Sequence, residues 1–162
     1  MTTKIAVFLA AAALVATTGA AEAKIKRKAQ SCAPVTAAAV ESQFETFNNA
    51  WATKNPDTVT ALFTPDAVLL PTVSNTPRTD PAGIRDYFVG FLQGAPIGTI
   101  NSSTIKLGCN KATRVGTWTV SLADATGARS DVKARYSFIY RFVGGKWKID
   151  HLHSSMMPEK TS

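Results

Sequence analysis

Two histidines near the end of the chain are the first candidates for chemistry. His151 and His153 are separated by one residue, and alternate residues of a strand share a face, so both imidazoles are expected beside Trp147 and Ile149. An imidazole can act as a base, bind a ligand or hold a metal. The spacing nominates no third ligand, so we predict no metal site. The alternative to a binding role is structural: one histidine takes part in a buried hydrogen-bond network and the other lies at a dimer contact.

A second candidate is Arg135, which interrupts a predicted strand. A guanidinium in mid-strand must reach solvent or pair with an anion. If Arg135 points inward, it binds the carboxylate of a small organic acid, with His151 or His153 beside it at the mouth of a cavity. If it points outward, it is a surface or interface charge. Tyr87 and Trp51 are the other pocket candidates, and the alternative for Tyr87 is a core ring with its hydroxyl at the edge.

Signals for catalysis are weak. No acidic residue falls on an inward-facing strand position, and Glu41 and Glu45 lie off the apolar stripe of their helix. Ser154 follows His153 directly, which is adjacency in sequence and not a triad. We therefore predict no catalytic residue and no cofactor.

Three helices are expected to come first. The first has an apolar stripe at three- and four-residue steps, formed by Ala37, Val40, Phe44, Phe47 and Trp51. Asn55-Pro56 and Asp80-Pro81 each join a capping residue to a first-turn proline, which predicts two more helices. The apolar segment 67–73 contains Pro71, which predicts an edge or bulged strand.

From residue 99 the apolar period changes to two. We predict strands over 99–107, 115–122, 130–143 and 146–154, with Gly144-Gly145 as the last hairpin turn. Helices followed by a meander are typical of an α+β fold, here three N-terminal helices packed on a curved antiparallel sheet. Such a sheet must curl around the first helix into a cone with a closed apolar end and an open mouth.

Length and composition limit the organisation of the chain. Its 162 residues, 45% hydrophobic and 18% charged, suit one folded domain and exclude a kinase, a nucleotide-binding α/β domain and a membrane transporter. Lys4, the uncharged run 5–21 and the small residues around Glu22 predict a signal peptide over 1–23, with a membrane anchor as the alternative. The remainder divides into an extended basic leader (24–34), the domain (35–158) and a tail (159–162).

The predicted signal peptide implies export, and the exported location limits which partners the protein can meet. We predict a periplasmic or secreted protein without stable membrane insertion after cleavage. The net charge is +7, and much of it lies in the leader, at Lys24, Lys26, Arg27 and Lys28. We interpret this cluster as a solvated tail, and we expect no nucleic-acid partner because no aromatic residues are interleaved with it.

The two cysteines are also informative. The chain has two cysteines, Cys32 and Cys109. An even number of cysteines in a chain with an export signal predicts a disulfide between them. The alternative is two buried free thiols. Neither belongs to a CxxC pair or a metal-ligand spacing, so redox catalysis and a structural zinc site lack support.

A resemblance covers about residues 35–158. The strand ARYSFIY followed by GKWKIDHLHSS, with segments 51–72 and 87–98, resembles the calcium/calmodulin-dependent protein kinase II association-domain family, and in particular its stand-alone bacterial members. This family belongs to the nuclear transport factor 2-like, SnoaL-like superfamily, which implies the cone fold and self-association. In the animal hub an arginine that follows the second histidine lines the cavity. Ser154 stands there in this chain, and Phe138 stands at the expected place of a second cavity arginine.

The resemblance leaves several functions open. Our leading prediction is an exported, non-catalytic domain that holds a small organic acid and forms a homodimer or higher homo-oligomer through the outer sheet face, since both faces are rather apolar. The first alternative is a SnoaL-type enzyme (isomerase, cyclase or dehydratase-like, or oxidoreductase-associated) acting on a small hydrophobic substrate. The second alternative is a purely structural oligomerisation module.

Overall fold

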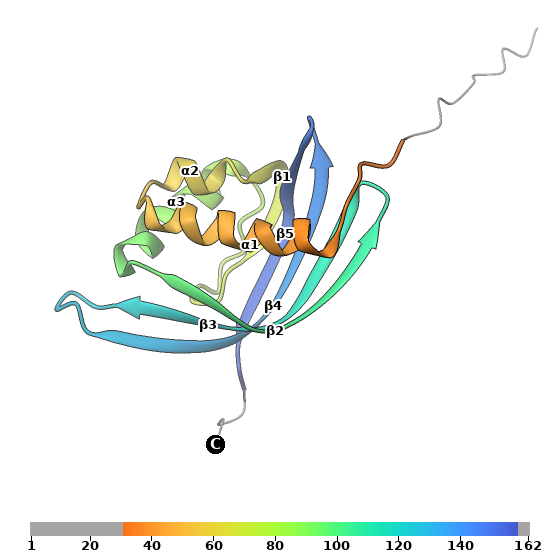
Figure 1. Cartoon of the computed structure of the whole chain (residues 1–162). Coiled ribbons are helices and arrows are strands. Elements are labelled where there is room, and N and C mark those ends of the chain that lie inside the picture. Colours follow the sequence, from red (N-terminus) through yellow and green to blue (C-terminus); the bar gives the residue numbers. More distant parts are fainter. Residues whose placement is uncertain (1–30, 159–162) are drawn as a thin grey trace, which may run out of the picture. The chain divides into compact units, whose positions relative to one another are not determined.

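Three helices come first in the chain and a long sheet follows. A computed structural model describes residues 31–158 (Figure 1). The predicted signal peptide, most of the leader and the tail lie outside the described residues. The elements are α1 (Ala37–Ala52), α2 (Pro56–Thr60), β1 (Phe63–Leu70), α3 (Pro81–Phe91), the 3₁₀ turn η1 (Leu92–Gly94), β2 (Ile97–Gly108), β3 (Lys111–Ala123), β4 (Arg129–Val143) and β5 (Lys146–Met156). The α+β prediction is confirmed.

Each helix begins at a side-chain cap. The Thr36 hydroxyl accepts a hydrogen bond from the Ala39 amide at 3.1 Å, and Asn55 and Asp80 cap α2 and α3 in the same way, each followed by proline. These caps satisfy backbone amides that have no partner inside the helix. Within residues 31–158, no helix is both long and apolar enough to cross a membrane.

The sheet is mixed rather than wholly antiparallel. Its strand order is β1-β5-β4-β3-β2, in which β2 to β5 form the predicted meander and β1 pairs with β5 in parallel. β1 starts at Phe63, earlier than predicted, and includes Pro65. Its pairing with β5 is interrupted between Phe63 and Val68, so the proline occupies an edge strand where no ladder hydrogen bond is lost.

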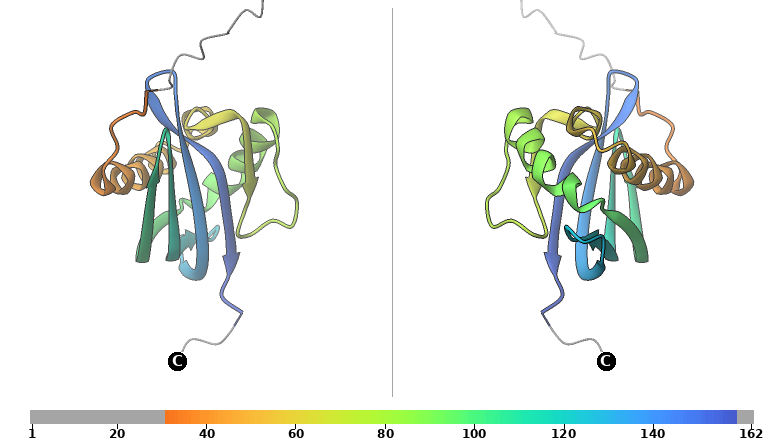
Figure 2. Two further views of the ribbon diagram at one scale, coloured as in Figure 1. Left: turned by 90° about the vertical axis from the view of Figure 1, so that its right-hand side faces the viewer. Right: turned by 90° about the vertical axis from the view of Figure 1, so that its left-hand side faces the viewer.

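All three helices cover the inner, concave face of the sheet, and no described element covers the outer face (Figures 1 and 2). The sheet bends at irregular pairing between Ile100 and Ser102 of β2. There the backbones approach so closely that a Cβ on Gly116 would lie 2.0 Å from the Ser102 carbonyl oxygen. The core fills the concave side with aromatic rings from α1, α3, β3 and β4.

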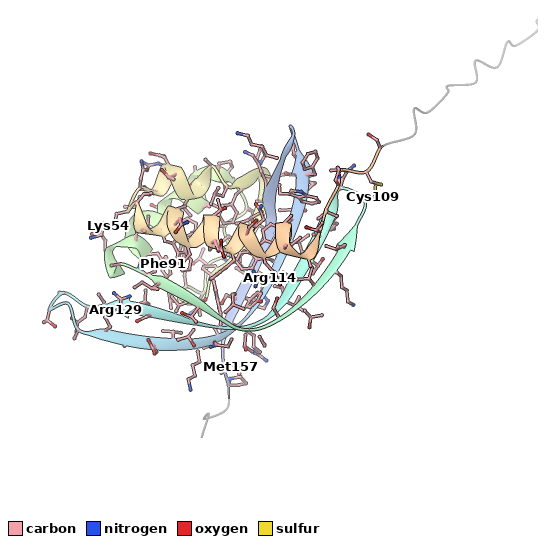
Figure 3. All side chains as sticks on the ribbon, in the orientation of Figure 1. Lys54, Phe91, Cys109, Arg114, Arg129 and Met157 are labelled. Carbon is pink, nitrogen blue, oxygen red and sulfur yellow. A yellow bond between two sulfur atoms is a disulfide. The ribbon has the colours of Figure 1, made fainter. Side chains whose placement is uncertain are left out.

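A disulfide joins Cys32, before α1, to Cys109, in the turn between β2 and β3, as predicted (Figure 3). Asn110 reinforces this connection from the same turn. Its Oδ1 accepts from the Ala33 amide at 2.7 Å and its Nδ2 donates to the Ser31 carbonyl at 3.2 Å. The segment on both sides of Cys32 is therefore held to the sheet by hydrogen bonds as well as by the covalent bond.

Candidate ligand-binding site

An apolar cavity lies between the helices and the inner face of the sheet. α1 and α3 supply its aromatic walls, and the loop after β1, with β3, β4 and β5, closes it. Its open space is about 20 Å³, enough for one water-sized group. The lining residues are Phe47, Trp51, Leu69, Pro71, Thr72, Val73, Tyr87, Phe88, Phe91, Trp118, Val120, Leu122, Val132, Leu152 and Ser154, none of which is ionised at neutral pH.

The few polar atoms of the cavity are neutral. Trp118 Nε1 donates to the buried Ser154 Oγ at 3.0 Å, and the Thr72 hydroxyl also hydrogen-bonds to Ser154 Oγ. The indole N–H of Trp51 is buried, and no acceptor among the described residues lies within hydrogen-bond distance. Trp51 itself is only 2% exposed. The cavity lining thus includes one indole, that of Trp51, whose N–H has no partner among the described residues.

A wider mouth continues outward from this cavity. Its open space is about 500 Å³. It shares Val73, Tyr87, Phe91 and Leu122 with the inner cavity, so these four side chains form the boundary between the two spaces. The other residues of the mouth are Ser74, Arg78, Asp86, Gly90, Gly94 and Ala123. Phe91, labelled in Figure 3 at the end of α3, packs against Trp51 with ring centroids 5.2 Å apart.

Arg78 brings a positive charge to the mouth. The loop after β1 turns back so that Arg78 and Leu69 exchange two backbone hydrogen bonds, of 2.8 and 2.9 Å. This bridge places the guanidinium 5.9 Å from the centre of the Tyr87 ring, where it also donates to the Thr76 carbonyl. Among the described residues, Arg78 forms no ion pair with a carboxylate. Asp86 is the acidic residue of the mouth.

Tyr87, a predicted pocket residue, lies between the inner cavity and the mouth. Its ring stacks on Phe91 with centroids 5.3 Å apart. Burial raises the pKa of the Tyr87 hydroxyl well above its ordinary value, and the nearby charge of Arg78 opposes this only in part. The hydroxyl therefore remains protonated at physiological pH. The structure places Trp51 and Tyr87 together in the cavity, and their role in binding a ligand stays a prediction.

Arg135 is placed elsewhere, which corrects the inward alternative. Its neighbours Ala134 and Tyr136 are buried in the core, so Arg135 points to the outer face and is exposed. There it donates to Ser155 Oγ at 3.3 Å. It borders a shallow surface depression together with His153, and it cannot reach a ligand inside the cone.

His151 and His153 share a face, as predicted, but this is the outer face and not the one that holds Ile149. The reason is a register shift: Tyr140 pairs with Ile149, whereas the preceding residue of β4 pairs with His151. Asp150 is the extra residue, and it reverses the alternation that follows. Burial lowers the pKa of His151, and the charge of His153 lowers it further, while Asp150 opposes both.

Three other arginines, Arg85, Arg114 and Arg141, are held by partners. Arg85 pairs with Asp57 at 2.6 Å. Arg141 of β4 pairs with Asp66 of β1 and with Asp150 of β5. Arg114, labelled in Figure 3, is buried beneath α1, where it donates to Ser103 Oγ at 2.9 Å and to a helix carbonyl. Within residues 31–158, no three histidine, cysteine, aspartate or glutamate side chains gather at a spacing that could hold a metal.

The sequence did not predict Arg78 at the mouth, nor the hydrogen-bonded group formed by Trp118, Ser154 and Thr72 in the cavity. One signal for Arg78 was available, because it is the only cation between Lys54 and Arg85. The position of the Arg78 side chain depends on the backbone bridge to Leu69, and no local sequence pattern predicts that bridge. From the sequence, Ser154 was considered as a neighbour of His153 and as a replacement for an arginine, and the structure shows that it lines the cavity.

Comparisons with known proteins agree with this architecture. Residues 36–158 match the model of the calcium/calmodulin dependent protein kinase II association domain. A Xanthomonas campestris structure named for that domain is 44% identical, with a TM-score of 0.76 over 80% of this chain and 96% of that chain. A scytalone dehydratase-named structure from Novosphingobium aromaticivorans is 13% identical (TM-score 0.65, 74% and 83% covered), which shows the fold alone. No curated protein matches the chain.

Proposed function

The chain belongs to the calcium/calmodulin dependent protein kinase II association domain family, and we propose that it is an exported, self-associating domain that holds a small hydrophobic organic acid. The body of this acid lies against the aromatic walls of the cavity and mouth. Its carboxylate lies at the mouth, beside Arg78. The proposal includes no chemical conversion of the ligand.

One observation carries the ligand proposal: among the described residues, an uncharged aromatic cavity adjoins a mouth whose only cation, Arg78, forms no ion pair. Apolar surface gains about 25 cal/mol per Å² when it leaves water. A carboxylate beside a guanidinium gains a charge-assisted hydrogen bond. The nearby Asp86 weakens this attraction, but it is exposed and screened by solvent. The acid therefore binds with its charge outward.

The residues that line the cavity also support a function without catalysis. A superfamily-type isomerase or dehydratase needs a base that can take a proton from the bound substrate. The residues that line the cavity supply hydroxyl and indole groups, but no carboxylate or imidazole. The two histidines lie on the opposite face of the sheet. This arrangement supports binding over proton transfer.

Self-association is proposed to occur through the outer face of the sheet, with a second copy of the chain as the occupant. The family is named for association, and no helix or strand within residues 31–158 covers this face (Figure 2). At its centre lie Val115, Thr117, Ser137 and Ile139, all half-buried. Short hydroxyl and aliphatic side chains allow two such faces to approach closely.

Export is supported by the pattern of residues 1–23 and by the Cys32–Cys109 disulfide. Such bonds persist mainly in oxidising compartments. The proposed location is the periplasm or the outside of the cell, where a small acid would be met in solution.

A matched pair of compounds tests the ligand proposal. Thermal unfolding is followed with para-isopropylbenzoate and with para-isopropylbenzyl alcohol, which has the same body and no charge. The acid is expected to raise the melting temperature more than the alcohol, because only the acid has a carboxylate for Arg78 and it should therefore bind more tightly. A ligand at 100 times its dissociation constant adds about 2.7 kcal/mol to the free energy of unfolding. Equal shifts would contradict the role of Arg78, and no shift with any hydrophobic carboxylate would contradict ligand binding.

A further inference from the structure

Building on the proposed function, we infer that the ligand carries an uncharged oxygen acceptor, such as a ketone or acyl oxygen, that enters the inner cavity and accepts a hydrogen bond from Trp51 Nε1. The bound molecule is then a keto- or acyl-substituted hydrophobic acid with two polar anchors. Arg78 holds its carboxylate at the mouth, and Trp51 holds its second oxygen inside.

Trp51 is the origin of this inference. A buried N–H without an acceptor costs free energy, and buried polar groups are nearly always paired. Trp51 is almost fully buried, it lines the cavity, and its Nε1 has no acceptor among the described residues. The comparable donor in the same cavity, Trp118 Nε1, is paired with Ser154. Of the two indoles, only that of Trp51 is left to a ligand.

The sizes of the two spaces agree with this assignment. The inner cavity has about 20 Å³ of open space, which admits a single oxygen-sized group and not a ring. The mouth has about 500 Å³, which admits the body of a small molecule. A ligand whose ring lies among Val73, Tyr87, Phe91 and Leu122 would therefore extend only a small substituent inward. That substituent meets Trp51.

The charge of the inner group follows from its surroundings. Within the part of the chain that the structure describes, no cation lines the inner cavity, and burying an unpaired carboxylate in an apolar site is costly. The group that meets Trp51 must accept a hydrogen bond and must be neutral. A carbonyl oxygen meets both requirements.

Two probes that differ in one group test the inference: para-acetylbenzoate, which has the carbonyl, and para-isopropylbenzoate, which has the same shape without it. Calorimetric titration is expected to show that the acetyl compound binds about three- to tenfold more tightly, as one net hydrogen bond allows. In Trp51→Phe this preference should disappear. In Trp147→Phe, whose ring packs on Phe142 at the last hairpin, it should remain.

The outcomes separate this inference from the proposed function. If both acids bind equally to the wild-type protein, the role of Trp51 is wrong and the acid-binding function stands. If neither binds, both are wrong. Should Trp51→Phe fail to fold, the indole ¹⁵N–¹H resonances of the wild-type protein decide. The Trp51 signal should shift more with the acetyl compound than with the isopropyl compound, and equal shifts would overturn the inference.

Discussion

Trp118 and Ser154 lie 36 residues apart in the sequence and are joined by a 3.0 Å hydrogen bond from Nε1 to Oγ in the cavity. Ser154 stands where the related animal hub is expected to have a cavity arginine. A guanidinium would make the inner cavity an anion site, whereas a serine paired with an indole leaves it neutral. On the proposed function, the charge that binds the acid therefore comes from the mouth.

Replacing Ser154 with alanine should destabilise the protein by about 1–3 kcal/mol, because the buried Trp118 Nε1 would lose its acceptor. Urea unfolding measures the change. Ser155→Ala is the matched control, since that hydroxyl lies on the outer face and accepts a long hydrogen bond from the exposed Arg135. Equal stability of the two variants would show that the Trp118–Ser154 bond contributes nothing.

Removing the disulfide, by Cys32→Ser with Cys109→Ser, should also destabilise the protein. The bond links residues 77 apart, and closing a loop of that size stabilises by about 4 kcal/mol in the chain-entropy model. The Asn110 hydrogen bonds remain in the variant, so the segment before α1 is expected to stay near the sheet. Calorimetric unfolding tests this, and an unchanged melting temperature would contradict it.

The elements could be predicted largely from the sequence because their signals are local. The caps at Asn55 and Asp80, the apolar stripe of α1 and the Gly144-Gly145 turn, where both glycines have positive φ, all depend on neighbouring residues. The parallel pairing of β1 with β5 could not be predicted, since it joins segments far apart in the chain.

The site was harder to predict, because its residues depend on register and on loop direction. One extra residue in β5, Asp150, reverses the side to which later side chains point, and this puts the histidines outside. Arg135 follows simple alternation, but which face is the inner one depends on where the helices pack. Trp51 and Tyr87 line the cavity, as bulky aromatic residues on the core face of a helix often do, and their role in binding stays a prediction.

A charge placed on the outer sheet face should disrupt self-association. Ile139 lies on β4, the central strand, and faces outward opposite His151. Ile139→Lys would bring one added charge from each copy into the proposed contact, and like charges in a desolvated contact repel. Sedimentation velocity at micromolar concentration should show loss of the assembly in this variant but not in Val89→Lys, on an exposed position of α3. A monomeric wild-type protein would contradict the proposal.

Stability should fall as the pH decreases from about 6.5, the ordinary pKa of histidine. Burial lowers the pKa of His151 in the folded protein, so the unfolded chain binds the proton more readily. The stability is therefore complete above pH 6.5 and is lost as the pH falls toward the folded-state pKa. The carboxylates with lowered pKa values, such as Asp66, titrate below this window. His151→Gln should lose less stability than the wild-type protein between about pH 7.5 and 5.5, and an identical loss would contradict this cause.

Arg78, and not Arg135, is proposed to receive the charge of the ligand, and calorimetric titration of para-isopropylbenzoate distinguishes the two arginines. Arg78→Gln should weaken binding about ten- to hundredfold, which corresponds to one hydrogen bond with a charged partner. Arg135→Gln, which removes the same charge from the outer face, should leave the affinity unchanged. Loss of binding in Arg135→Gln with full affinity in Arg78→Gln would show that Arg78 does not bind the carboxylate.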